Sequence, residues 1–80
     1  MNPFIKSCTD ENTSLINMDL VRYIDKSTMA EIKDFGHVFW IIFHFSENHY
    51  ITWNYSRPSF NDRYKKFITD LHKIEDYFST

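Results

Sequence analysis

Apolar and aromatic residues dominate one stretch of the chain, between Val38 and Tyr55. This stretch reads Val-Phe-Trp-Ile-Ile-Phe-His-Phe-Ser-Glu-Asn-His-Tyr-Ile-Thr-Trp-Asn-Tyr, and a polar segment around Glu47 and Asn48 interrupts it once. β-Branched and aromatic residues on both sides of such a segment are typical of two antiparallel strands. The pattern therefore predicts a β-hairpin that carries many rings.

The length of the hairpin loop decides which side chains share a face, because side chains alternate along a strand with a period of two. A loop of two or four residues would set Phe45 opposite Tyr50 and mix apolar with polar residues on both faces. A loop of three or five residues pairs Phe45 with Ile51 and Phe43 with Trp53, and we favour it because it separates the faces. One face then holds Phe39, Ile41, Phe43, Phe45, Ile51, Trp53 and Tyr55. The other face holds Trp40, Ile42, His44, Tyr50, Thr52 and Asn54.

The C-terminal part of the chain has the period of an amphipathic helix. Pro58 breaks the preceding strand, and Ser59 is expected to cap the helix, with Asp62 placed to interact with the free amides of the first turn. Apolar side chains then recur on one stripe, at Phe60, Tyr64, Phe67, Leu71, Ile74 and Phe78. This spacing predicts a helix near residues 59 to 78, and its stripe is expected to pack on the sheet face that holds Phe43 and Trp53.

The first half of the chain has shorter patterns. Residues 4 to 9 and 13 to 17 are predicted to form two strands joined by a polar turn, and residues 21 to 25 a third strand after a corner at residues 18 and 19. Residues 27 to 36 are compatible with a helical turn or with an irregular link into the hairpin. The predicted fold is α+β, an antiparallel sheet of about four strands with one C-terminal amphipathic helix packed on one face.

The stretch Leu-Ile-Asn-Met-Asp-Leu-Val-Arg-Tyr-Ile, which begins at Leu15, resembles part of many small bacterial and phage β-sheet proteins, including flagellar FlbD-like proteins. In those proteins a strand, an Asn-x-Asp corner and a second strand follow each other, and the later strands and closing helix have a similar order. The resemblance implies the fold and brings no catalytic residues with it. The chain shows no repeat or linker, so residues 1–80 are expected to form a single domain.

The charge balance disfavours a dedicated nucleic-acid-binding domain. Nine Lys and Arg stand against eleven Asp and Glu, and the pI is near 6.0, whereas such domains usually present a basic face. The main basic cluster consists of Arg57, Arg63, Lys65 and Lys66. Asp62 and Asp70 interleave with this cluster on the predicted helix, so we interpret it as a solvated face of mixed charge.

The sequence carries no motif for catalysis or metal binding. Cys8 and the histidines, which are His37, His44, His49 and His72, lack the close spacing of metal ligands. No pattern for an oxyanion site or an orienting base accompanies Cys8, and a chain of 80 residues leaves little room for a deep substrate cleft. We expect a protein that is not an enzyme and that uses no metal and no cofactor.

Composition suggests where the protein acts. The chain has no run of about 18 apolar residues and no signal-peptide pattern at its start, and a free thiol fits a reducing compartment. We therefore expect a cytoplasmic protein that does not associate with a membrane. Residues with AT-rich codons, such as Phe, Ile, Asn and Lys, far outnumber Gly, Ala, Arg and Pro, which indicates a low-GC bacterium, its phage or another mobile element.

A single helix can cover only one face of a sheet, so the other face is expected to be open to water or to a partner. We therefore expect a small protein-binding module, of the kind that phages encode to inhibit host defence effectors, such as anti-CRISPR proteins. The expected partner is a larger protein or a protein-RNA effector whose basic surface meets acidic residues of this chain. The expected contact residues are Trp40, His44, Glu47 and Tyr50.

Two alternatives stay open. The first is a nucleic-acid-associated regulatory protein, in which the sheet rings stack on unpaired bases. Its phosphate contacts would come from Arg57, Arg63, Lys65 and Lys66. The second is a homodimer that forms through a sheet edge. A stoichiometric protein partner and a nuclease-sensitive association would separate the binding module from the regulator.

Overall fold

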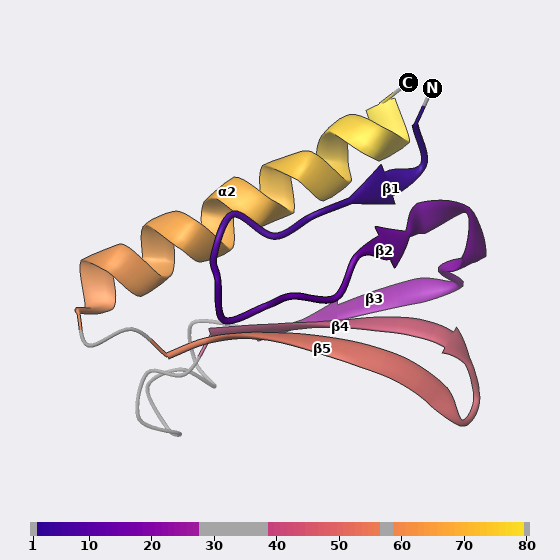
Figure 1. Cartoon of the computed structure of the whole chain (residues 1–80), viewed down its shortest axis with the longest axis horizontal. Helices are drawn as coiled ribbons and strands as arrows, with labels where there is room; N and C mark the ends of the chain where they lie inside the picture. The colour runs from indigo at the N-terminus through magenta and orange to yellow at the C-terminus, as the bar shows by residue number, and fades with distance from the viewer. Residues whose placement is uncertain (1, 28–38, 57–58, 80) are drawn as a thin grey trace.

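The computed structural model describes residues 2–27, 39–56 and 59–79, and Figure 1 shows the arrangement of its elements. In chain order they are β1 (Phe4–Ile5), β2 (Ile16–Asn17), the 3-10 helix η1 (Met18–Leu20), β3 (Tyr23–Lys26), β4 (Phe39–Ser46), β5 (His49–Tyr55) and α2 (Phe60–Ser79). The α+β class with one C-terminal helix is confirmed. None of the described helices is both long and apolar enough to cross a bilayer.

The strands form two antiparallel sheets, so the prediction of one sheet with about four strands is wrong. One sheet pairs β1 with β2, and the other has the order β3-β4-β5. The predicted strands at residues 4 to 9 and 13 to 17 shorten to two residues each. Between them the chain leaves the ladder, because Ser7 and Cys8 donate hydrogen bonds to a side chain of α2, that of Asp70.

The hairpin has a two-residue turn at Glu47 and Asn48, and the register shifts between His44 and Ser46. The predicted pairs are therefore wrong by two residues, since Trp53 lies opposite Ile41. The separation of the two faces is nevertheless confirmed. The shift adds one residue to β4, and such a bulge restores the alternation that a two-residue loop alone would reverse.

The buried core lies between the three-stranded sheet and α2. Its fully buried sheet residues are Phe39, Ile41, Phe43, Trp53 and Tyr55. On the helix side Phe67 packs its ring 4.9 Å from that of Phe39 and 5.7 Å from that of Tyr55. The face of the sheet that holds the apolar half of the hairpin is thus the face that α2 covers, as the sequence predicts.

The helix begins where the sequence predicts, because the Ser59 hydroxyl accepts a hydrogen bond from the backbone N–H of Asp62 at 3.3 Å. The predicted stripe is core only in its middle, at Phe67 and Ile74. Phe78 is 66% exposed, and Phe60 and Tyr64 are exposed as well. Phe60 and Tyr64 nevertheless contact the sheet, with ring centroids 5.5 and 5.9 Å from that of Phe39, so only the C-terminal end of the stripe leaves a ring largely in solvent.

Candidate interaction surface

The face of the β3-β4-β5 sheet that points away from α2 is called the outer face here. Strand alternation and the observed pairing place on it Tyr23, Asp25, Trp40, Ile42, His44, Tyr50, Thr52 and Asn54. Figure 1 shows α2, β1 and β2 together on the other side of this sheet. The outer face is therefore the part of the sheet that the described helix leaves open.

Three rings form a row across the outer face, and we call them the aromatic row: Tyr23 of β3, His44 of β4 and Tyr50 of β5. The strand register sets them directly opposite one another. The rings of Tyr23 and His44 stack with centroids 4.2 Å apart and planes only 10° apart, and Tyr50 lies 6.0 Å from His44. Tyr23 is 56% exposed and Tyr50 is 59% exposed, so both present a large ring surface to solvent.

A carboxylate accompanies this row. Nε2 of His44 lies 2.9 Å from Oδ2 of Asp25, and the Asp25 side chain is 56% exposed. Asp25 and Tyr23 are two residues apart on β3, so both point to the outer face. The outer face therefore combines flat, exposed rings with an accessible negative charge.

The structure brings only part of the predicted contact residues together. His44 and Tyr50 are direct cross-strand neighbours. Trp40 shares their face but lies four residues back along β4, about 13 Å away along the strand, and is partly buried. Glu47 is exposed in the hairpin turn.

Sequence reasoning missed Tyr23 and Asp25 as contact residues. It placed both in a strand, but their position beside His44 depends on the pairing of β3 with β4. The available signal was the period of two that puts a ring and a carboxylate on one face of a strand. That signal gains meaning only when the neighbouring strand and its register are known.

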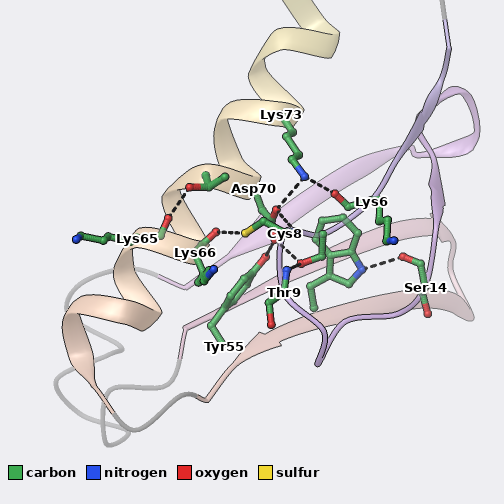
Figure 2. Close-up of polar contacts among 12 residues, drawn as sticks. Lys6, Cys8, Thr9, Ser14, Tyr55, Lys65, Lys66, Asp70 and Lys73 are labelled. Atoms are coloured by element: carbon green, nitrogen blue, oxygen red, sulfur yellow. Dashed lines mark hydrogen bonds and ion pairs between the residues drawn. The ribbon is translucent and has the colours of Figure 1, made fainter.

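The predicted basic cluster lies on a different side of the molecule. Arg63, Lys65 and Lys66 belong to α2, and Arg57 lies outside the described residues. In Figure 2 the Lys65 side chain extends away from the helix. A pocket of about 330 Å³ beside this helix is lined by Cys8, Thr9, Asp10, Asp62 and Lys66, so acidic groups accompany the basic ones there.

A buried carboxylate lies on the inner side of the sheet, where Asp70 of α2 is completely buried. Oδ2 accepts hydrogen bonds from the hydroxyls of Ser7 and Tyr55, each at 2.6 Å, and Oδ1 accepts one from the backbone N–H of Cys8 at 2.9 Å. Nζ of Lys73 is 3.8 Å from Oδ1. Figure 2 shows how these groups converge from the helix, the sheet and the N-terminal segment.

Sequence reasoning interpreted Asp70 as a solvated member of a mixed-charge helix face. Its position contained the opposite signal, because it lies three residues after Phe67 and four before Ile74, which places it on the buried stripe. Burial, with the nearby Asp70 carboxylate as the second cause, raises the pKa of the Cys8 thiol. Burial and the hydrogen bond to Asp70 likewise raise the pKa of Tyr55. These shifts keep both groups protonated as donors, and a protonated thiol is a poor nucleophile.

A second surface feature is an apolar groove of about 370 Å³ near the hairpin turn. It is lined by Leu15, Asn17, Leu20, Phe45, Ser46, His49 and Ile51. Leu15 and Leu20 are both more than half exposed. Phe45 and Ile51 belong to the face of the hairpin that points towards α2. The groove is therefore separate from the outer face.

Within residues 2–27, 39–56 and 59–79, no three His, Cys, Asp or Glu side chains are grouped closely enough to hold a metal ion. Comparison of the chain with protein-family models, with curated proteins and with solved structures finds no match. The resemblance in layout to FlbD-like proteins therefore stays a prediction.

Proposed function

We propose that this protein is a small, non-enzymatic binding module that docks onto a larger protein through its outer face. The aromatic row is the observation that carries the proposal. Tyr23 and Tyr50 leave more than half of their surface in water, where large rings are less stable than in a core. Exposed Tyr side chains supply rigid contact area at low conformational cost and are enriched among residues that dominate binding energy.

The charges near the aromatic row favour a partner with a basic surface. Asp25 and Glu47 are exposed, and none of the residues of the outer face is Lys or Arg. A protein or protein-RNA effector that grips nucleic acid has to display such basic residues. The exposed rings and carboxylates, the net negative charge and the excess of residues with AT-rich codons together support a cytoplasmic inhibitor of the anti-CRISPR kind. Such an inhibitor would be encoded by a phage or another mobile element with a low-GC genome.

The nucleic-acid alternative is less well supported, because its two elements lie apart. The exposed rings are on the outer face, whereas Lys65 and Lys66 are on α2, which packs on the inner face. A single strand that stacks on Tyr23 would meet carboxylate rather than basic groups there. Stacking without nearby phosphate contacts forgoes the main source of affinity for nucleic acids.

A homodimer through a sheet edge meets an obstacle at β5. The Asn12 side chain donates a hydrogen bond to the backbone oxygen of Asn54 and accepts one from its N–H, both at 2.9 Å. The Glu11 carboxylate accepts hydrogen bonds from the N–H and hydroxyl of Ser56. These contacts occupy backbone groups that a partner strand would need, so a dimer of this kind would have to use the edge formed by β3.

The test is affinity capture from lysate of a low-GC bacterium, followed by calorimetry with the recovered partner. We expect capture to survive nuclease treatment. Replacing Tyr50 with Ala should weaken binding by about 1 to 4 kcal/mol while the melting temperature stays within a few degrees of wild type. Tyr50 is a better position than Trp40 for this purpose, because Trp40 is partly buried and its loss also affects packing.

The matched control is Leu20→Ala, which removes an exposed apolar side chain from the groove instead of the outer face. This variant should bind like wild type. Weaker binding by Leu20→Ala with normal binding by Tyr50→Ala would move the interface to the groove. Loss of all capture on nuclease treatment would favour the regulator that associates with nucleic acid.

A further inference from the structure

The outer face has a more specific chemistry than a general basic-surface contact requires. We infer that the aromatic row and Asp25 form a recognition site for an arginine side chain of the partner, an inference that rests on the proposed function. The site has two components, an exposed aromatic ring, that of Tyr23, and a carboxylate on the same face of the sheet. Each component is present in the free protein, already held in place by contacts between strands.

The stacking surface is the exposed ring of Tyr23, which His44 supports from one side within the aromatic row. Tyr23 and His44 lie almost parallel, with planes 10° apart, and their positions on neighbouring strands are set by the β3-β4 register. A guanidinium group is planar, delocalised and weakly hydrated, so it stacks on such ring faces better than the compact, strongly hydrated ammonium of Lys does. Because Tyr23 and His44 stack face to face, each covers one face of the other, and the exposed ring of Tyr23 on the edge strand β3 keeps its other face for a guanidinium. The exposed ring of Tyr50 lies 6.0 Å from His44 at a tilt of 40° and adds a second aromatic contact.

The carboxylate is Asp25. His44 engages its Oδ2, and Oδ1 accepts no hydrogen bond from any residue that the structure describes. The contact with His44 also restricts the orientation of the carboxylate, so less side-chain freedom is lost on binding. A guanidinium stacked on the row has several N–H donors in one plane, and one of them can reach Oδ1 while the ring contact persists.

The surroundings of this site agree with a cationic ligand. Among the described residues, none on the outer face is Lys or Arg, so these side chains place no permanent positive charge beside a bound guanidinium. Glu47 in the adjacent turn is exposed, and the chain has a formal net charge of −2, which favours the approach of a basic partner. An apolar side chain bound there would exclude water from Oδ1 of Asp25 without replacing its hydrogen bond. An acidic side chain would be repelled by the Asp25 carboxylate.

The experiment is an NMR titration of the whole ¹⁵N-labelled protein with two blocked tripeptides of equal charge, acetyl-Gly-Arg-Gly-amide and acetyl-Gly-Lys-Gly-amide. The arginine peptide should shift the resonances of Tyr23, Asp25, His44 and Tyr50 and bind at least about fivefold more tightly than the lysine peptide. Similar affinities for the two peptides, or shifts confined to other surfaces, would overturn the inference.

Two variants and one control separate stacking from plain charge attraction. Asp25→Asn and Tyr23→Leu should each lower the affinity for the arginine peptide by at least about threefold. Glu75→Gln removes the same charge from an exposed position on α2 and should leave the affinity for the arginine peptide unchanged. An equal loss of affinity in all three variants contradicts a built site.

The failure of this inference can be told apart from the failure of the proposed function. If binding of the partner depends on Tyr50 but the protein binds the two peptides equally well, the binding module stands and the arginine site falls. If the peptides behave as expected but the partner ignores Tyr50→Ala, the arginine site stands and the proposed interface falls.

Discussion

Asp70 and Asp25 lie on opposite sides of the three-stranded sheet, and each accepts a hydrogen bond from a ring-bearing residue. Asp70 is completely buried and accepts from Tyr55, Ser7 and Cys8. The Asp25 side chain is more than half exposed, and among the described residues its carboxylate has a hydrogen bond with His44 alone. The same residue type thus joins three segments of the fold on one side and presents a charge to solvent on the other.

The difference between the two carboxylates comes from what covers them. On the inner side the N-terminal segment runs between α2 and the sheet, as Figures 1 and 2 show, and brings the donors of Ser7 and Cys8 to Asp70. A buried carboxylate is tolerated only when its hydrogen bonds are complete. A buried polar group with a full set of partners therefore indicates a structural role, whereas an exposed one with a spare oxygen is available to a ligand.

The largest expected effect is the loss of Asp70. Replacing it with Ala leaves the buried hydroxyls of Ser7 and Tyr55 and the N–H of Cys8 without an acceptor, at about 1 to 3 kcal/mol for each orphaned group. We expect the free energy of unfolding to fall by about 3 to 5 kcal/mol, enough to unfold much of a small domain. Urea denaturation followed by circular dichroism measures this.

The comparison variant is Asp25→Ala, which should cost less than about 1 kcal/mol because an exposed pair contributes little to stability. Equal losses in the two variants would mean that Asp25 also has a structural role, which would weaken its assignment to a ligand site. A wild-type melt for Asp70→Ala would show that the buried hydrogen bonds do not join the segments.

The next effect sharpens the contrast between the covered and open parts of α2. Phe67→Ala should destabilise the protein by about 2 to 5 kcal/mol, because it leaves a cavity beside Phe39 and Tyr55. Phe78→Ala, at the other end of the predicted stripe, should change stability by less than about 0.5 kcal/mol, since that ring is largely exposed. Thermal melts of the two variants test this. An equally large fall in melting temperature for both would place Phe78 in the core as well, and no fall for either would remove Phe67 from it.

The smallest expected effect is a pH dependence of stability that comes from Tyr55, on the inner side of the sheet. Burial and the contact with Asp70 raise the pKa of Tyr55 above its unfolded value of 10.0. The stability that this shift contributes is fully present below pH 10 and is lost as the pH rises towards the folded pKa, because the unfolded chain then releases a proton that the folded chain retains. At one pH unit above 10, the loss is at most about 1.4 kcal/mol.

Unfolding free energies measured between pH 8 and 11 test this dependence. Tyr55→Phe should be less stable than wild type at pH 8 and should lose less stability as the pH rises. Cys8 adds to the alkaline loss in both proteins, because the pKa of its thiol is also raised. Parallel pH curves for the two proteins would show that Tyr55 does not contribute to the alkaline loss.

The sequence by itself determined the parts of this protein that depend on short-range periodicity. The alternation between Phe39 and Tyr55 identified the hairpin and its two faces, and the period of α2 with its Ser59 cap identified the helix. These predictions succeed because each depends on neighbours only a few residues apart, where backbone geometry alone sets which side chains share a face.

Only the tertiary structure decided the hairpin partners, the split into two sheets, and the environments of Asp70 and Asp25. A bulge moved the register by two residues without changing the faces. Asp70 binds Ser7 across 63 positions of sequence, and Asp25 meets His44 across 19. Local pattern holds no information on such pairings, because whether a polar side chain is solvated or buried depends on which distant segment covers it.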